Sequence, residues 1–367
     1  MSLLASLTVV AVACAVSAAQ TQAATENLTF QSSTYSSFRQ LLRREEPSAR
    51  VDVPGWLSLP EVAGRMPAVV IVHTLAGYRA QNEGWQADAL QHAGFATLTY
   101  DSFAARNMGD LVATPMQGPP PYASALADAF AALSALARDP RIDPRRIAIL
   151  GFSFGGEVAH DAAFERLRAT LAGGELRFAA HVAYYPAGVY GVVAAANAYT
   201  GAPILMMIGG DDTLPMAKAD AYLAYARGSG YLAPVELLSY ADAKHGWTDP
   251  ALGTASEYPH LASTRNCPFA LITPNRGLEL LIDGQERRFD DSSWEACIRG
   301  SLGYVMGYDE KIRRQSIDAA IAFLKQNLSP KASRLVGGLI NRRRSGSIDR
   351  CRGGAPFGPM PRAIQWR

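Results

Sequence analysis

Short apolar runs alternate with longer amphipathic segments between residues 68 and 240, and this alternation restricts the fold more than any other feature of the chain. The runs contain β-branched residues and are bounded by Gly, Pro or Asp. Because strands that are apolar on both faces belong in a parallel sheet covered by helices, the runs predict such a sheet. The expected strands are residues 68–73, 95–100, 146–151, 179–185, 203–209 and 235–240.

The segments between these strands carry helix signals. Three expected helices, over 84–94, 122–139 and 215–230, each have Gly or Pro where these residues begin or end helices. The chain has 367 residues, of which 49% are hydrophobic, and this is enough to bury a large core. The alternation therefore predicts a doubly wound α/β domain with helices on both faces of a mostly parallel sheet.

The alternation stops after residue 245. Residues 249–305 contain hairpin-like stretches around 278–289, and a helix returns only at 308–328. Because a structureless loop of this length is unusual, we expect an ordered excursion within a domain that covers residues 24–330. We place this excursion near the rim of the site described below, where it shapes the substrate pocket.

The first 23 residues hold an apolar run followed by small residues suited to cleavage at about position 18 or 23. We interpret residues 1–23 as a signal peptide, which predicts a secreted or periplasmic protein. A buried N-terminal helix is the alternative, since the segment lacks a Lys or Arg. The run is short for a membrane span, which needs about 20 residues. Lipid attachment at Cys14 is disfavoured because Ala11 stands where a large aliphatic residue is expected.

Charge is unevenly distributed along the chain. Residues 331–367 carry nine Lys or Arg against the single acid Asp349, and removing that +8 from the total of +2 leaves −6 for residues 1–330. The main body is therefore mildly acidic and indicates no nucleic-acid surface. The tail is rich in Gly, Pro and Arg, and we expect it to be disordered.

Cysteine usage agrees with export. Cys14 leaves with the signal and Cys351 lies in the tail, so the body keeps Cys267 and Cys297. In an exported protein this pair predicts one disulfide, with two reduced core thiols as the alternative. No Cys-x-x-Cys or His cluster has metal-ligand spacing, so we expect no metal site.

A Gly-x-Ser-x-Gly motif, GFSFG at residues 151–155, lies between an expected strand and a helix expected over 156–169. In this context the motif forms a sharp turn, and its glycines let the strand and helix approach each other. The Ser153 hydroxyl then projects at the helix N-terminus, where free N–H groups favour a developing anion. We therefore predict that Ser153 is a nucleophile; the alternative is a glycine-softened turn.

A serine nucleophile needs a base to take its proton and a third group that orients the base. His245 follows the last expected strand, where a loop at the carboxyl edge of the sheet brings it over Ser153. The acid is expected after the preceding strand, where Asp211 and Asp212 are adjacent. The number of residues between the end of the strand and the acid favours Asp212, whereas the number of residues between the acid and the start of the next helix favours Asp211. We favour Asp212 and keep Asp211 as the alternative.

Two backbone N–H donors are needed to hold an oxyanion. One is expected from Phe154, the residue after the nucleophile, and the other from Leu75, in the loop after the first apolar run. Polar and aromatic side chains near strand ends are candidates for substrate binding, with a solvated loop or core packing as the alternative. These candidates are Thr74, Asp101, Arg106 and Trp247.

Several of these stretches together resemble the dienelactone hydrolase family of α/β-hydrolases. The resemblance spans about residues 65–250, and the final helix also fits. It implies an α/β-hydrolase fold, a triad at Ser153, His245 and Asp212, and an oxyanion hole at Leu75 and Phe154. The matching stretches are AVVIVHTLAG, ATLTYDSF, DPRRIAILGFSFGG, HVAYYP, ILMMIGGDDTLP and YADAKHGW.

The chain departs from the family pattern at two positions. Ser153 stands where the namesake enzymes have a cysteine, so the chain is more similar to an exported branch of the family that has serine. Thr74 stands where an acidic residue, or the glycine of a His-Gly loop, is usual. The resemblance therefore implies serine chemistry.

These features predict a serine hydrolase that cleaves a carboxylic ester or lactone through an acyl-enzyme, with a small-molecule substrate and no cofactor. An acyltransferase or peptidase on the same triad is the alternative within enzymes, because pocket shape chooses the acceptor. A non-catalytic binding protein with this fold is the alternative from another class. The sequence carries no signal of oligomeric state.

Overall fold

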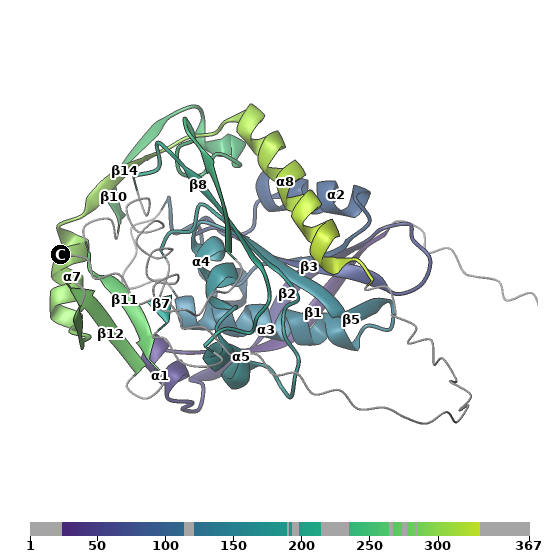
Figure 1. Cartoon of the computed structure of the whole chain (residues 1–367), viewed down its shortest axis with the longest axis horizontal. Helices are drawn as coiled ribbons and strands as arrows, with labels where there is room; N and C mark the ends of the chain where they lie inside the picture. The colour runs from purple at the N-terminus through teal and green to yellow at the C-terminus, as the bar shows by residue number, and fades with distance from the viewer. Residues whose placement is uncertain are drawn as a thin grey trace, which may run out of the picture. The chain divides into compact units, whose positions relative to one another are not determined.

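An eight-stranded sheet forms the centre of the described part of the chain, and helices lie against it (Figure 1). The strand order is β1-β2-β4-β3-β5-β6-β8-β9, and every neighbouring pair from β4 to β9 is parallel. The predicted α/β class with a mostly parallel sheet is therefore confirmed. The parallel strands are β4 (Ala96–Tyr100), β3 (Met66–Val72), β5 (Ile142–Phe152), β6 (His181–Tyr184), β8 (Ile204–Gly209) and β9 (Val235–Tyr240).

The structure is a computed structural model, and the residues that it describes form several ranges. The expected signal peptide, the expected helix at 215–230 and the basic tail lie outside these ranges. Inside them, none of the helices combines the length and the apolar character that a membrane span requires. The described ranges are 24–113, 121–188, 191–192, 198–213, 235–263, 267–273, 277–282 and 285–330.

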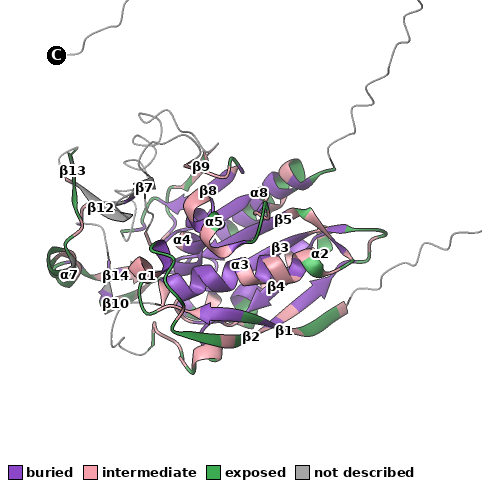
Figure 2. Ribbon diagram, turned by 90° about the horizontal axis from the view of Figure 1, so that it is seen from below, coloured by how far each residue is buried: buried purple, intermediate pink, exposed green. Residues whose placement is uncertain are grey.

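Both faces of the sheet are buried, which explains why its strands are continuously apolar. In β3, Val70 packs into the core on one face, whereas Val69 and Ile71 pack into the core on the other face. Figure 2 shows the buried residues of the sheet enclosed between the helices. The core on the face of Val70 contains α3 (Tyr122–Arg138). The core on the face of Val69 and Ile71 contains α2 (Trp85–His92) and α8 (Glu310–Leu328).

The single helix expected after Ser153 was wrong, because the chain forms two helices there. α4 (Phe154–Asp161) ends, and α5 (Glu165–Leu171) begins after three intervening residues. Between them, Phe164 forms an isolated β-bridge with Tyr199, and the N–H group of the next residue donates to a carbonyl of the same distant segment. A long-range backbone contact therefore breaks the helix.

Two N-terminal strands and a short helix were not anticipated from the sequence. β1 (Ala24–Thr34) and β2 (Ala49–Leu59) pair antiparallel, and β2 pairs antiparallel with β4. α1 (Phe38–Leu42) lies between them in the chain. These strands extend the sheet at one edge and bury Phe30 and Val53 against the core.

The excursion over 249–305 is ordered where the structure describes it. One part is an antiparallel strand pair, and the other is a small sheet that contains the expected hairpin around 278–289. Its last strand lies beside the loop of His245, whose carbonyl accepts a hydrogen bond from Gly307 N–H at 3.0 Å. The elements are η3 (Pro250–Leu252), β10 (Ser256–Ala262), β11 (Phe269–Thr273), β12 (Gly277–Ile282), β13 (Gln285–Arg288), α7 (Asp291–Arg299) and β14 (Leu302–Met306), with β7 (Gly191–Val192) paired to β11.

A disulfide joins Cys267 to Cys297, as expected, with their Cα atoms 5.5 Å apart. We predict that replacing both cysteines by serine lowers the free energy of unfolding by about 3 kcal/mol, because the bond restricts a loop of that length in the unfolded chain. Urea unfolding measures this loss. A reducing agent should bring the wild type to the level of the double variant and leave the variant unchanged; equal stability of the oxidised proteins contradicts the prediction.

Candidate active site

Ser153 occupies a sharp turn between β5 and α4. Its backbone has φ 52° and ψ −112°, a region that residues with a side chain rarely adopt. Such a conformation costs on the order of 1–3 kcal/mol and persists only where its surroundings hold it. Here the Ser153 N–H donates to the Tyr184 carbonyl at 3.0 Å, and the Ser153 carbonyl accepts from Glu157 and Ala187 N–H groups. The turn therefore holds the serine at the N-terminus of α4.

Two glycines make this turn possible. A Cβ atom at Gly151 would lie 2.0 Å from the Gly155 carbonyl oxygen, and one at Gly155 would lie 2.3 Å from the Val72 carbonyl oxygen. Real Cβ atoms do not approach backbone oxygens so closely. The glycines therefore allow α4 to pack directly on the ends of β3 and β5.

The structure brings Ser153, His245 and Asp212 together at the carboxyl edge of the sheet, after β5, β9 and β8. His245 Nε2 lies 2.7 Å from Ser153 Oγ, and His245 Nδ1 lies 2.8 Å from Asp212 Oδ2. Because an ionised carboxylate only accepts hydrogen bonds, Nδ1 carries the proton and Nε2 accepts from the serine hydroxyl. All three residues are buried. This is the arrangement of a nucleophile, a base and an orienting acid.

Asp211, the alternative acid, lies elsewhere. Its side chain is 56% exposed and pairs with Lys244, whose Nζ is 3.7 Å from a carboxylate oxygen. The structure therefore brings Asp212, not Asp211, to His245.

Leu75 and Phe154 lie where two backbone donors are expected. Phe154 is the first residue of α4, so its N–H has no acceptor within the helix. The Leu75 N–H takes part in no hydrogen bond among the described residues, and Leu75 lines the same pocket as Ser153. The Leu75 N–H is therefore available to a ligand in this pocket, whereas Phe154 is buried and is not among the lining residues.

The loop that carries Leu75 is held by a buried carboxylate. Glu83 is 1% exposed and accepts hydrogen bonds from the N–H groups of Thr74 (3.3 Å) and Arg79 (2.9 Å) and from the Asn82 amide (3.0 Å). Burial raises the pKa of Glu83 to about 7, although the hydrogen bonds from Arg79 and Asn82 lower this pKa. Thr248 donates to Asn82 Oδ1 and ties this carboxylate to the loop after His245.

A pocket of about 410 Å³, part of it open to solvent, lies over Ser153 and His245. Its lining combines apolar side chains, among them Val112, Leu252 and Met306, with the charged pair of Arg79 and Asp249. Thr74 lines it as expected from the sequence. The complete lining is Thr74, Leu75, Ala76, Arg79, Val112, Ser153, Tyr185, His245, Gly246, Asp249, Leu252, Tyr304 and Met306.

The other three candidates for substrate binding are not among the lining residues. Arg106 is buried and bonds the Asp128 carboxylate on α3 at 2.8 and 2.9 Å. Asp101 accepts hydrogen bonds from two N–H groups of its own loop. Trp247 is fully buried, with its ring 4.5 Å from that of Tyr185. All three therefore have structural contacts in place of the expected substrate contacts.

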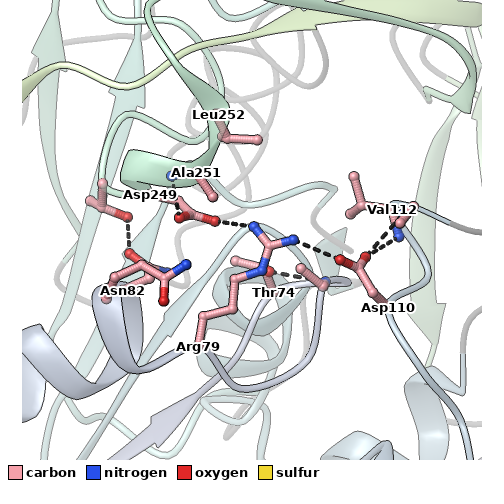
Figure 3. A network of polar contacts seen from close by, with 12 residues as sticks. Thr74, Arg79, Asn82, Asp110, Val112, Asp249, Ala251 and Leu252 are labelled. Carbon is pink, nitrogen blue, oxygen red and sulfur yellow. Dashed lines mark hydrogen bonds and ion pairs between the residues drawn. The ribbon is translucent and has the colours of Figure 1, made fainter.

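Sequence reasoning missed the polar side of the pocket. Figure 3 shows the Arg79 guanidinium between the carboxylates of Asp110 and Asp249. Their position in the chain is a usable signal, because Asp249 follows His245 by four residues and Arg79 closely follows the loop of Leu75. In the ranges that the structure describes, no group of three or more His, Cys, Asp or Glu residues is placed to hold a metal ion.

The pKa of Glu83 predicts a pH-dependent stability. This carboxyl group titrates at about 7 in the folded protein and near 4.5 ordinarily, so the folded state binds the proton more tightly. The free energy of unfolding should therefore fall by up to about 3 kcal/mol as the pH rises from 4.5 to 7, and should not change further above 7 because of this group. Urea unfolding of the wild type and Glu83→Gln between pH 4.5 and 8 measures the difference.

The exposed Glu257 offers a matched control. Glu257→Gln should keep the pH dependence of the wild type, whereas Glu83→Gln should lose the part that belongs to the buried group. A difference between wild type and Glu83→Gln that stays constant with pH contradicts the prediction.

Comparisons with known proteins identify the family of the chain. The chain is similar to the crystal structure of a dienelactone hydrolase-like promiscuous phosphotriesterase from metagenomic libraries, with 19% identity, a TM-score of 0.52, and coverage of 83% of this chain and 99% of that chain. It is also similar to an α/β-hydrolase enzyme from a Medee basin deep-sea metagenome library, with 16% identity, a TM-score of 0.44, and coverage of 82% and 98%. No curated protein matches the chain in sequence. The model of the dienelactone hydrolase family matches residues 53–265, more than half of the chain, which therefore belongs to this family.

Proposed function

We propose that this chain is an exported serine hydrolase that cleaves a carboxylic ester or lactone. The hydrogen-bonded chain from Ser153 through His245 to Asp212 carries the proposal. Membership of a hydrolase family supports it. The disulfide between Cys267 and Cys297 and the signal peptide expected at 1–23 support export, because disulfides persist in oxidising compartments.

The proposed reaction begins with attack of Ser153 Oγ on the substrate carbonyl while His245 Nε2 takes the hydroxyl proton. Asp212 holds the imidazole and stabilises its protonated form. The N–H groups of Leu75 and Phe154 hold the oxyanion of the tetrahedral intermediate. His245 then protonates the leaving alcohol, and the resulting acyl-enzyme is hydrolysed by a water that the same histidine deprotonates. These steps need no cofactor.

His73 supports this reaction by positioning the Leu75 donor. Its Nδ1 lies 2.6 Å from the Thr74 carbonyl oxygen, and its Nε2 lies 3.1 Å from the Ser102 nitrogen, whose N–H donates to it. A carbonyl cannot donate and an N–H cannot accept, so His73 is neutral with its proton on Nδ1. Burial lowers the pKa of His73 and favours the same form. In a trans peptide the Leu75 N–H points away from the Thr74 carbonyl, so the imidazole aims that N–H.

The two adjacent aspartates provide a matched test of the triad. We expect Asp212→Asn to lower kcat for a 4-nitrophenyl ester by about 10³- to 10⁴-fold, because the histidine loses its orienting partner, and Asp211→Asn to stay near the wild type. Ser153→Ala should abolish both hydrolysis and labelling by a fluorophosphonate probe. Initial rates and mass spectrometry of the labelled protein measure these effects.

Three outcomes would change the assignment. Labelling of Ser153→Ala at the level of the wild type would remove the catalytic role, as for a binding protein with this fold. A large loss in Asp211→Asn with none in Asp212→Asn would make Asp211 the acid. Faster cleavage of a peptide, or transfer of the acyl group to an added alcohol in preference to water, would favour the peptidase or acyltransferase alternative.

The role of His73 predicts a loss in kcat without a loss in binding. His73→Leu keeps the side-chain volume but removes the donor, and we expect a decrease in kcat of about 10- to 100-fold with KM unchanged. A trifluoromethyl ketone inhibitor forms a similar oxyanion on the serine, so its binding to His73→Leu should be weaker by a similar factor. His73→Asn places an amide N–H near the position of Nδ1 and should restore most of the rate. Equal losses in the Leu and Asn variants would refute the positioning role.

A further inference from the structure

Arg79 is the only Lys or Arg among the residues that line the described pocket, and its charge is already matched. Its Nη1 lies 2.5 Å from Asp249 Oδ2 and its Nη2 lies 2.6 Å from Asp110 Oδ2. The Arg79 side chain is 21% exposed, whereas that of Asp249 is 5% exposed. The guanidinium is therefore bound by two carboxylates at the wall of the pocket (Figure 3).

Both aspartates are fixed by backbone groups. Asp249 Oδ1 accepts a hydrogen bond from the Ala251 N–H at 3.0 Å, at the start of the short helix η3. Asp110 Oδ1 accepts from the N–H groups of Val112 (2.8 Å) and Ala113 (3.0 Å). Each carboxylate thus keeps one oxygen on its own loop and presents the other to Arg79. The three charged groups form a built arrangement that links three separate loops.

The charges around the pocket are mostly negative. Asp249 and Asp110 flank Arg79, and Asp212 carries a third negative charge behind His245. In a partly buried site these charges act on a ligand with little screening. A carboxylate on the substrate would meet this excess of negative charge, and to form a full ion pair with Arg79 it would have to displace an aspartate. The displaced Asp249 would then remain as a buried anion without its partner.

We propose that the Asp110–Arg79–Asp249 cluster makes the site select against acyl groups that carry a free carboxylate. This inference rests on the proposed ester hydrolysis. The apolar wall of Val112, Leu252 and Met306 faces the same space and suits an uncharged chain. Arg106 offers no alternative anion site, since its guanidinium is buried against Asp128.

Three esters of one shape test the selectivity. Their acyl groups are six-carbon chains that end in a carboxylate, a primary amide or an ammonium group, each esterified with 4-nitrophenol. We expect kcat/KM for the amide ester to exceed that for the carboxylate ester by at least about tenfold, with the ammonium ester at or above the amide ester. The dissociation constants of the three esters for Ser153→Ala, measured by calorimetry, should follow the same order.

Asp110→Asn tests the assignment to the cluster. The asparagine oxygen can still accept from Val112 and Ala113, but the negative charge beside Arg79 is gone. We expect kcat/KM for the carboxylate ester to rise about fivefold relative to the amide ester. Asp88→Asn, which removes an exposed carboxylate on α2, should leave this ratio unchanged.

Equal affinity of Ser153→Ala for the carboxylate and amide esters would overturn the selectivity, whether or not the wild type hydrolyses them. A preference for the carboxylate ester, or no change of ratio in Asp110→Asn, would also overturn it. Hydrolysis that survives Ser153→Ala would instead contradict the proposed function. The two failures are therefore distinguishable.

Discussion

The strained backbone of Ser153 is the constraint on which the rest of the site depends. It requires glycines at 151 and 155, because the helix that follows lies against the carbonyl groups at the end of β3. That close contact places the N-terminus of α4 against Val72 and His73, directly before the loop that begins at Thr74. The loops of Asp212 and His245 follow β8 and β9, at the same carboxyl edge of the sheet as the turn. One backbone conformation therefore brings together residues that are up to 92 positions apart.

The parallel sheet and the serine turn were predictable because their information is local. A strand buried on both faces must be continuously apolar, and a tight turn against a helix must have glycine at fixed spacing. The N-terminal strands β1 and β2 lack such a signature, and they join the sheet through the pairing of β2 with the distant β4. The break between α4 and α5 was not predictable for a related reason. Ala162 and Ala163 favour helix, and the interruption depends on contacts with the segment around Tyr199.

The same distinction applies inside the site. The order of serine, acid and histidine along the chain indicated the three groups, but two adjacent aspartates differ only in which one is buried. Burial is a property of the folded chain, and it favours Asp212. Arg79 joins partners 31 and 170 residues away, so the cluster forms no local motif, although Arg79 and Asp249 each lie close in sequence to an expected site residue. Arg106 shows the converse error, since a charged residue near a strand end is used to hold α3.

The wall of the pocket and the reacting groups come from separate parts of the chain. Tyr304 and Met306 line the pocket from β14, the strand that closes the excursion, and Met306 forms a β-bridge with His245. The excursion has its own strand pairs and its own disulfide, and the turn of Ser153 belongs to the central sheet. Sequence changes in the excursion can thus reshape the pocket without altering the turn that carries Ser153. The architecture lets the shape of the pocket evolve separately from the central sheet.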